Sequence, residues 1–186
     1  MRLKLTLAAL AATAAFASPA VAQVVIPPAS DVGTARGTVL RPLSVSEDEN
    51  LDFGTILVDG SAAGWVEVDA EDGSRSVDGG GGVQLVALQP GGRGVFTVTA
   101  SQGQQVDLTL TPPVGNVLIH VDGSGAQVDI SQFRLDNVAG PLGLNDSRIT
   151  GNSGAHVVGV GARFEIDATQ PHGVYSATYQ LTAEYN

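Results

Sequence analysis

The residues of this chain that could do chemistry are acidic loop residues, three histidines and one serine-containing turn. The acidic runs lie at 47–49 and 69–72. Calcium takes its oxygen ligands from such flexible loops. The second run does not follow the EF-hand pattern, however, because the sixth position counted from Asp69 is Ser74 and the twelfth is Gly80. Solvated loop carboxylates account for both runs, and we expect no metal site.

The histidines and the serine-containing turn also lack the spacing of a site. His120, His156 and His172 are scattered, and the chain has no cysteine to complete a zinc or transition-metal site. The turn at 151–154 contains a serine but has no histidine in a matching upstream motif, so it is interpreted as a polar hairpin turn. Trp65, the only tryptophan, is interpreted as a core anchor rather than a sugar platform. We therefore expect no enzyme, no catalytic residue and no cofactor.

The strongest local pattern is an alternation of apolar and polar residues from Gly173 to the C-terminal end of the sequence. One side of this alternation carries all three tyrosines of the protein. Its members are Tyr175, Ala177, Tyr179, Leu181, Ala183 and Tyr185. Successive side chains of a strand point to opposite faces, so this period of two predicts one long, half-buried β-strand. We expect this strand, with Gly173 at its start, to be a pairing and assembly surface.

Short segments rich in Val, Leu, Ile, Phe and Thr recur between turn residues, and we expect about ten strands from them. They are residues 38–45, 51–58, 64–69, 83–88, 94–100, 105–111, 116–121, 126–135, 156–166 and 173–185. Turn signals at this spacing are typical of an all-β sandwich or barrel. No segment beyond the N-terminal apolar run has the helical spacing of apolar residues, so little helix is expected.

Residues 1–22 have the features of a signal peptide. Arg2 and Lys4 precede an apolar run of about 13 residues, and residues 20–22, Ala-Val-Ala, form a small-x-small cleavage site. The run is shorter than the roughly 18 residues that span a bilayer, so no transmembrane anchor is expected. We expect export to the periplasm, to a surface fibre or to the medium. The rest of the chain is predicted to be a flexible N-terminal arm, residues 23–36, and one β-sandwich domain, residues 37–186.

The charge of the chain disfavours two classes of partner. Without Arg2 and Lys4, seven of the nine basic residues remain against nineteen acidic ones. A strongly acidic protein repels nucleic acid and anionic membranes, so we expect neither as a partner. The absence of cysteine means that apolar packing, rather than disulfides, must hold an exported domain together.

Two motifs resemble those of an uncharacterised family of secreted bacterial domains. The opening motif is the stretch Pro-Leu-Ser-Val at 42–45 followed by Leu-Asp-Phe-Gly-Thr-Ile at 51–56. The closing motif is a G-x-Y-x-x-T-x-x-(V/L)-T-x-x-Y-N strand, matched by Gly173, Tyr175, Thr178, Leu181, Thr182, Tyr185 and Asn186. The similarity spans most of residues 37–186. It implies a domain of unknown function without settled activity.

The closing strand is also similar to the C-terminus of fimbrial subunits assembled by the chaperone-usher route of Gram-negative bacteria. Gly173 is fourteenth from the end of the sequence and Tyr185 is penultimate, as in those subunits. The resemblance implies an immunoglobulin-like, pilin-like antiparallel β-sandwich that lacks one strand. Its partners would be other copies or related subunits, with a periplasmic chaperone and an outer-membrane usher, in a pilus that serves cell adhesion.

The N-terminal arm is compatible with two hypotheses about the function of the protein. As a donor arm it offers Val24 and Ile26, then Val32 and Thr34, but two prolines at 27 and 28 interrupt the alternation. In the first hypothesis the protein is an exported structural subunit of a surface fibre, assembled by strand donation. In the second, residues 38–45 supply the first strand of a complete sandwich. That protein would be a secreted binding module for carbohydrate or protein, with loops such as 71–82 or 140–154 as its binding surface.

Overall fold

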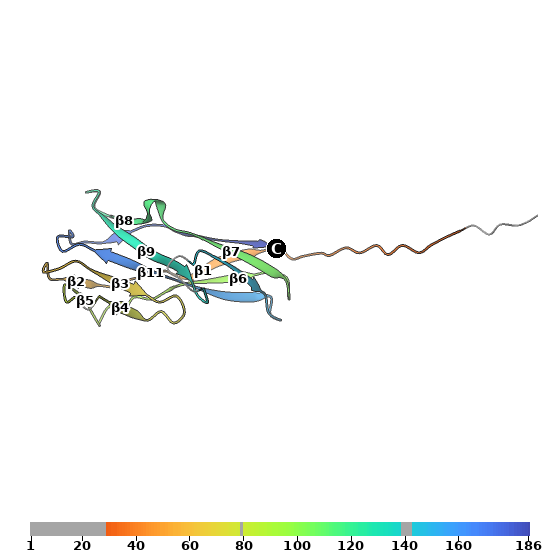
Figure 1. Ribbon diagram of the computed structural model, residues 1–186, viewed down its shortest axis with the longest axis horizontal. Coiled ribbons are helices and arrows are strands. Elements are labelled where there is room, and N and C mark those ends of the chain that lie inside the picture. Colours follow the sequence, from red (N-terminus) through yellow and green to blue (C-terminus); the bar gives the residue numbers. More distant parts are fainter. Residues whose placement is uncertain (1–28, 79, 139–142) are drawn as a thin grey trace, which may run out of the picture. The chain divides into compact units, whose positions relative to one another are not determined.

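The computed structural model describes residues 29–78, 80–138 and 143–186 (Figure 1). The chain divides into two units, residues 1–37 and residues 38–186. In the described part of the first unit, residues 29–37, the side chains are exposed and no strand or helix forms. The strands described below belong to the second unit.

The second unit is built from short antiparallel strands and one single-turn 3-10 helix. The strands are β1 (Ser44–Glu49), β2 (Ile56–Val58), β3 (Gly64–Val68), β4 (Arg75–Val77), β5 (Val83–Leu85), β6 (Gly94–Thr99), β7 (Gln105–Thr111), β8 (Val117–His120), β9 (Gln127–Leu135), β10 (Asn145–Ile149), β11 (Ala155–Ile166), β12 (Tyr175–Ser176) and β13 (Gln180–Tyr185). The 3-10 turn η1 (Val114–Asn116) precedes β8. The expectation of an all-β fold is confirmed.

The strands form one large sheet and two small ones. The eight-stranded sheet has the order β1-β6-β11-β9-β8-β12, and β3 and β4 join it because β3 also pairs with β11. The three-stranded sheet has the order β10-β7-β13, and β2 pairs with β5. Strand β11 is the central strand of the large sheet. Along one edge its first half pairs with β6 and its second half pairs with β3. Figure 1 shows β9 alongside β11, and β7 alongside the C-terminal strand.

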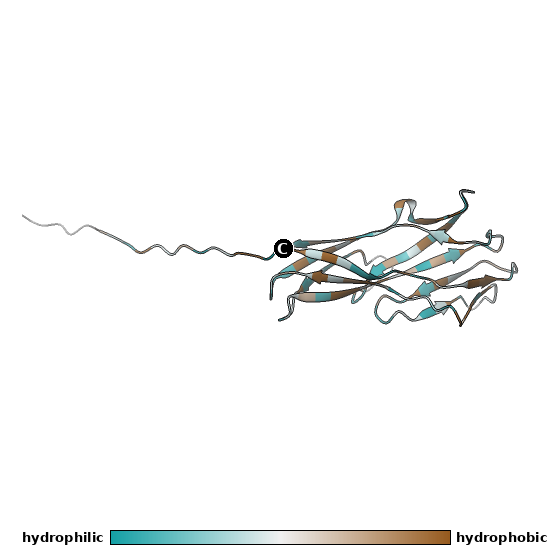
Figure 2. Cartoon of the chain, turned by 180° about the vertical axis from the view of Figure 1, so that it is seen from behind, coloured by the Kyte–Doolittle hydropathy of each residue, from teal (hydrophilic) through white to brown (hydrophobic). Residues whose placement is uncertain are grey.

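The core lies between the sheets and follows from the alternation within each strand. Strand β6 alternates buried and half-buried residues without error, and β7 alternates buried with more exposed ones. Bands of different hydropathy along the strands are visible in Figure 2. A single apolar cluster joins residues of the large sheet, such as Val158 and Val160, to Leu108 and Leu110 of the three-stranded sheet. The fold is therefore an antiparallel β-sandwich, as expected.

Two strand predictions were wrong in detail, and two strands were missed. The C-terminal segment is not one strand, because the chain leaves the large sheet after Ser176 and joins β7 only at Gln180. The first strand, predicted at 38–45, begins at Ser44. Strands β4 and β10 were not predicted. β10 reads Asn-Asp-Ser-Arg-Ile and lacks apolar alternation, and β4 has only three residues.

The interpretation of Trp65 as a core anchor was also wrong. Its neighbours Val66 and Val68 are fully buried, so Trp65 points to the opposite, outer face of the large sheet. The indole is half-buried, and the guanidinium carbon of Arg163 lies 4.0 Å from the centroid of its ring. Trp65 is thus a surface residue stacked on an arginine.

Candidate assembly edge

The predicted assembly residues meet at one unpaired strand edge. Strand β13 pairs with β7 on one side, and within the described residues no strand pairs with its other side. The main-chain N–H of Asn186 donates to the carbonyl of Gln105 over 3.2 Å, which sets the phase of the ladder. Main-chain groups of alternate residues face alternate sides of a strand. Those of Leu181, Ala183 and Tyr185 therefore point to the open edge.

The apolar face of the C-terminal segment packs on the core with one exception. Four of the predicted residues are half-buried against the core cluster, and Leu181 is buried within it. The four are Tyr175, Tyr179, Ala183 and Tyr185. Ala177 is exposed, because it lies where the chain crosses from one sheet to the other. The structure thus brings the three phenol rings inward, as the alternation predicted, but places Tyr175 in the large sheet, Tyr185 in the three-stranded sheet and Tyr179 between them.

Tyr185 ties the end of β13 to the large sheet. Its hydroxyl accepts a hydrogen bond from the main-chain N–H of Ser101 at 2.7 Å and donates one to the carbonyl of Arg41 at 2.9 Å. The N–H of Arg41 also donates to the Ser101 hydroxyl at 2.7 Å. Arg41 precedes β1 and Ser101 follows β6, so one phenol hydroxyl bridges the two sheets at this end of the sandwich.

Tyr179 lies in the crossing segment and reaches into the core. Its ring meets those of Phe133 and Phe96 edge to face, with centroids 5.2 and 5.8 Å apart. The hydroxyl is buried and has no hydrogen-bond partner among the described residues. Burial, with the nearby carboxylate of Glu47, raises the pKa of Tyr179 to about 12, against a weaker opposing effect of the main chain of Leu51, which is close but makes no hydrogen bond of normal geometry. This side chain therefore contributes apolar contact, while its hydroxyl is buried at a cost.

Tyr175 and Gly173 anchor the other end of the segment. The Tyr175 hydroxyl donates to the carbonyl of Pro171, four residues upstream, at 2.6 Å, and accepts from the amide of Gln170 at 2.7 Å. A tyrosine bonded back to the main chain in this way forms a tyrosine corner in immunoglobulin-like sandwiches. Gly173 has φ +150°, and a Cβ at this position would lie 1.9 Å from Nε2 of the buried His120. The close approach of His120 therefore requires glycine here.

The neighbouring edge, on β1, is protected from pairing. Strand β1 lies at the end of the large sheet, is in contact with β13 and pairs only with β6 among the described strands. Its register shifts between Glu47 and Glu49, and Asp48 between them accepts a hydrogen bond from the Thr97 hydroxyl at 2.6 Å. Bulges and charges are the usual protection of an edge strand. Strand β13 has an unbroken register and a single acidic residue, Glu184, so its edge is the more open one.

The predicted donor arm is only partly described. Val24 and Ile26 lie outside the described residues. Val32 is 93% exposed, and Thr34 is exposed and belongs to no strand. The side chains of both are exposed, although the N–H of Val32 donates to the carboxylate of Asp31 at 2.8 Å, and their use as a donor stays a prediction.

One buried ion cluster was missed from the sequence. Arg148 of β10 is 8% exposed and donates to carboxylates of Asp136 at 2.6 Å and Asp146 at 2.5 Å. Burial alone would lower the pKa of Arg148, but the bonds to these two carboxylates outweigh burial and raise it. The only signal was an arginine in a polar segment, which does not distinguish a buried strand from a loop. This cluster holds β10 against the end of β9.

The described residues include neither a cluster of metal ligands nor a membrane-spanning helix. Across residues 29–78, 80–138 and 143–186, no three His, Asp or Glu side chains gather closely enough to hold a metal ion. Over the same ranges, no helix has the length and apolar character needed to cross a bilayer.

Comparison with known protein families identifies the family of this chain. Residues 43–185 match the model of the family described as Domain of unknown function (DUF4402). The chain belongs to this family. The expected membership of an uncharacterised family is therefore confirmed, and the DUF4402 match covers both motifs except their outermost residues, Pro42 and Asn186. No curated protein and no solved structure matches the chain.

Proposed function

We propose that this DUF4402 protein is an exported structural subunit of a bacterial surface fibre, assembled by strand donation. The open edge of β13 carries the proposal. It offers N–H and carbonyl groups at Leu181, Ala183 and Tyr185, next to side chains that belong to the core. An extended segment added to such an edge gains a ladder of main-chain hydrogen bonds.

The proposed donor is the N-terminal arm of a second copy or a related subunit. Residues 29–37 carry no strand and are exposed, and Val32 and Thr34 alternate with smaller residues as an added strand requires. Donation from one copy to the next is a head-to-tail contact, which produces an open filament rather than a closed ring. Before assembly, a periplasmic chaperone would cover the edge, and an outer-membrane usher would release the growing fibre.

Size-exclusion chromatography of residues 23–186, compared with residues 37–186, tests the proposal. The longer form is expected to elute as concentration-dependent oligomers, and the shorter form as a monomer that still binds an added peptide of residues 23–36. The proposal fails if both forms are equally stable monomers that never assemble and neither binds the peptide.

Two proline variants separate loss of the edge from loss of the fold. Ala183→Pro removes an N–H that faces the open edge, where proline is tolerated. Glu184→Pro removes an N–H that faces β7, because residue 184 is in the same phase as Asn186. Ala183→Pro is expected to fold and remain monomeric, whereas Glu184→Pro is expected to lose about 2 kcal/mol of stability. If Ala183→Pro assembles as the unaltered protein does, this edge is not the assembly site.

A second candidate function is ligand binding, as in a self-contained binding module. One observation favours it: a hollow lined by Trp65 and several carboxylates at one end of the large sheet. Ligand binding there and strand donation at β13 involve different sheets, so the two functions are compatible.

A further inference from the structure

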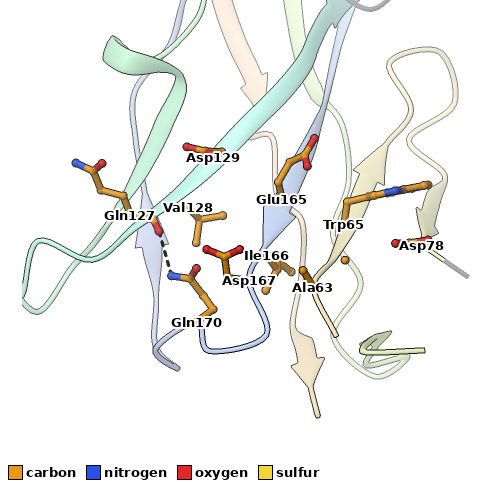
Figure 3. Close-up of a pocket in the computed structure, with 11 residues that line it drawn as sticks. Ala63, Trp65, Asp78, Gln127, Val128, Asp129, Glu165, Ile166, Asp167 and Gln170 are labelled. Atoms are coloured by element: carbon orange, nitrogen blue, oxygen red, sulfur yellow. Dashed lines mark hydrogen bonds between the residues drawn. The ribbon is translucent and has the colours of Figure 1, made fainter. Parts of the chain in front are cut away.

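A hollow of about 510 Å³ lies at the end of the large sheet where β3 and β9 begin and β11 ends, and its volume is in the range of roughly 300–1,000 Å³ typical of small-molecule sites. Figure 3 shows its lining side chains, which come from β3 and the residue before it, from β9, from β11 and the segment after it, and from Asp78 just after β4. They include one aromatic ring, Trp65, and the amides of Gln127 and Gln170. Four carboxylates complete the polar lining: Asp78, Asp129, Glu165 and Asp167.

Strand register places the key side chains in one row. Trp65 of β3 is directly opposite Glu165 of β11, which is directly opposite Asp129 of β9. The N–H of Asp78 donates to the carbonyl of Trp65 at 3.0 Å, so Asp78 extends the row on the far side of β3. Directly opposite residues share a face. The sheet therefore presents an indole and three carboxylates side by side.

The arginines nearest the hollow are neutralised elsewhere. Arg163 donates twice to Glu67, at 2.7 and 3.2 Å. Arg134 is bonded to Glu67 at 3.0 Å and to Asp69 at 2.9 Å. Arg163 also stacks on one face of the Trp65 ring, 4.0 Å from its centroid, so only the remaining surface of the indole is available to a ligand. Because Arg163 and Arg134 are paired with Glu67 and Asp69, their charges are already balanced next to the hollow.

The hollow itself keeps uncompensated negative charge. None of the described residues that line it is basic. The carboxylate of Glu165 accepts a hydrogen bond from the neutral hydroxyl of Ser131 at 2.5 Å, and its cross-strand neighbour is the like-charged Asp129. Like charges directly opposite each other destabilise a strand pair. A bound cation would remove this repulsion.

We propose that the hollow binds a small organic cation, with a protonated primary amine among Glu165, Asp129 and Asp167 and its carbon frame against Trp65. The carboxylates do not converge closely enough for a metal ion, which favours a larger cation. An aromatic ring attracts cations through its face and packs on an apolar frame. The only lysine in the sequence is Lys4, so no lysine of residues 5–186 can supply the amine.

Two sources share this chemistry: an amino sugar with a free amine, and an aliphatic diamine. Because Trp65 is the only tryptophan, its fluorescence reports binding at this site directly. We would titrate the purified protein with glucosamine disaccharide, its N-acetylated form and putrescine, following fluorescence and calorimetric heat in parallel. The glucosamine disaccharide or putrescine is expected to bind, more weakly as salt rises, and the neutral N-acetylated disaccharide is expected not to bind.

Charge-removing variants locate the amine. Glu165→Gln and Asp129→Asn are each expected to weaken binding about fivefold, the ratio for a strong exposed ion pair, and to leave thermal stability equal or higher. Glu184→Gln, on β13, removes an exposed carboxylate elsewhere and is the matched control with unchanged affinity. The proposal is overturned if neither amine gives heat or a fluorescence change, if the N-acetylated disaccharide binds as tightly, or if Glu165→Gln binds with unaltered affinity.

Discussion

Tyr179→Phe is expected to stabilise the protein at neutral pH, although it removes a hydroxyl group that could form a hydrogen bond. The hydroxyl is buried without a partner among the described residues, while the ring keeps its edge-to-face contacts with Phe96 and Phe133. An unpaired buried polar group costs about 1–3 kcal/mol, and phenylalanine retains the ring. We expect the free energy of unfolding at pH 7 to rise by about 1 kcal/mol.

The same substitution should remove part of the loss of stability at alkaline pH. The pKa of Tyr179 is raised from 10.0 to about 12 in the folded protein. Above pH 10 the unfolded chain releases this proton while the folded protein retains it, so the contribution is complete below pH 10 and is lost as pH rises to about 12. The loss should reach up to about 2 kcal/mol, after allowance for screening at a half-buried ring.

Urea denaturation followed by far-ultraviolet circular dichroism, between pH 7 and pH 11.5, measures both effects. Tyr185→Phe is the matched control, because its hydroxyl makes hydrogen bonds to Ser101 and Arg41 and its loss should destabilise at pH 7 by about 1–2 kcal/mol. The reasoning is refuted if Tyr179→Phe destabilises the protein at pH 7, or if its stability falls with pH as steeply as that of the unaltered protein.

Three further substitutions probe the ends of the sandwich. Gly173→Ala should destabilise the protein by about 3 kcal/mol in chemical denaturation, because the added Cβ would clash with His120. Adding His120→Ala to this variant should restore part of the loss. If Gly173→Ala is as stable as the unaltered protein, there is no clash. Arg148→Met should cost about 3 kcal/mol by leaving the buried Asp136 and the half-buried Asp146 unpaired, visible as a fall in Tm. A Tm unchanged within error would contradict this. Tyr175→Phe should lose about 1 kcal/mol with its bond to Pro171, and an unaltered melting curve would show that the corner contributes nothing.

Much of the fold was predictable from local alternation. The seven residues of β7 were predicted with the bounds that the structure has, and the second half of the chain yielded β9 and β11 within one residue at their starts. Strand β7 has one buried face, so its residue types follow a period of two, whereas β11 is buried on both faces from Val158 to Ala162 and was predicted from its run of small and apolar residues. Strand β10 was missed because its buried member is Arg148, and an arginine is buried only when distant carboxylates neutralise it.

The candidate site was likewise predictable from the sequence only in part. Alternation identified the inward faces of Tyr175, Tyr179 and Tyr185, but it could not reveal that the chain changes sheets between Ser176 and Gln180. Both halves satisfy the same pattern of side chains, whichever strand they pair with. The row of carboxylates beside Trp65 was likewise invisible, because Glu165 and Asp129 are far apart in sequence and become neighbours only through the register of β11 and β9.

The sequence by itself determined that the chain forms half-buried antiparallel strands, because burial on one face imposes alternation on each strand separately. The tertiary structure alone decided which strands pair, which edge stays open and which charges come to lie side by side. Those properties depend on register between segments distant in the chain, and register is set by the packing of the whole core rather than by any one segment.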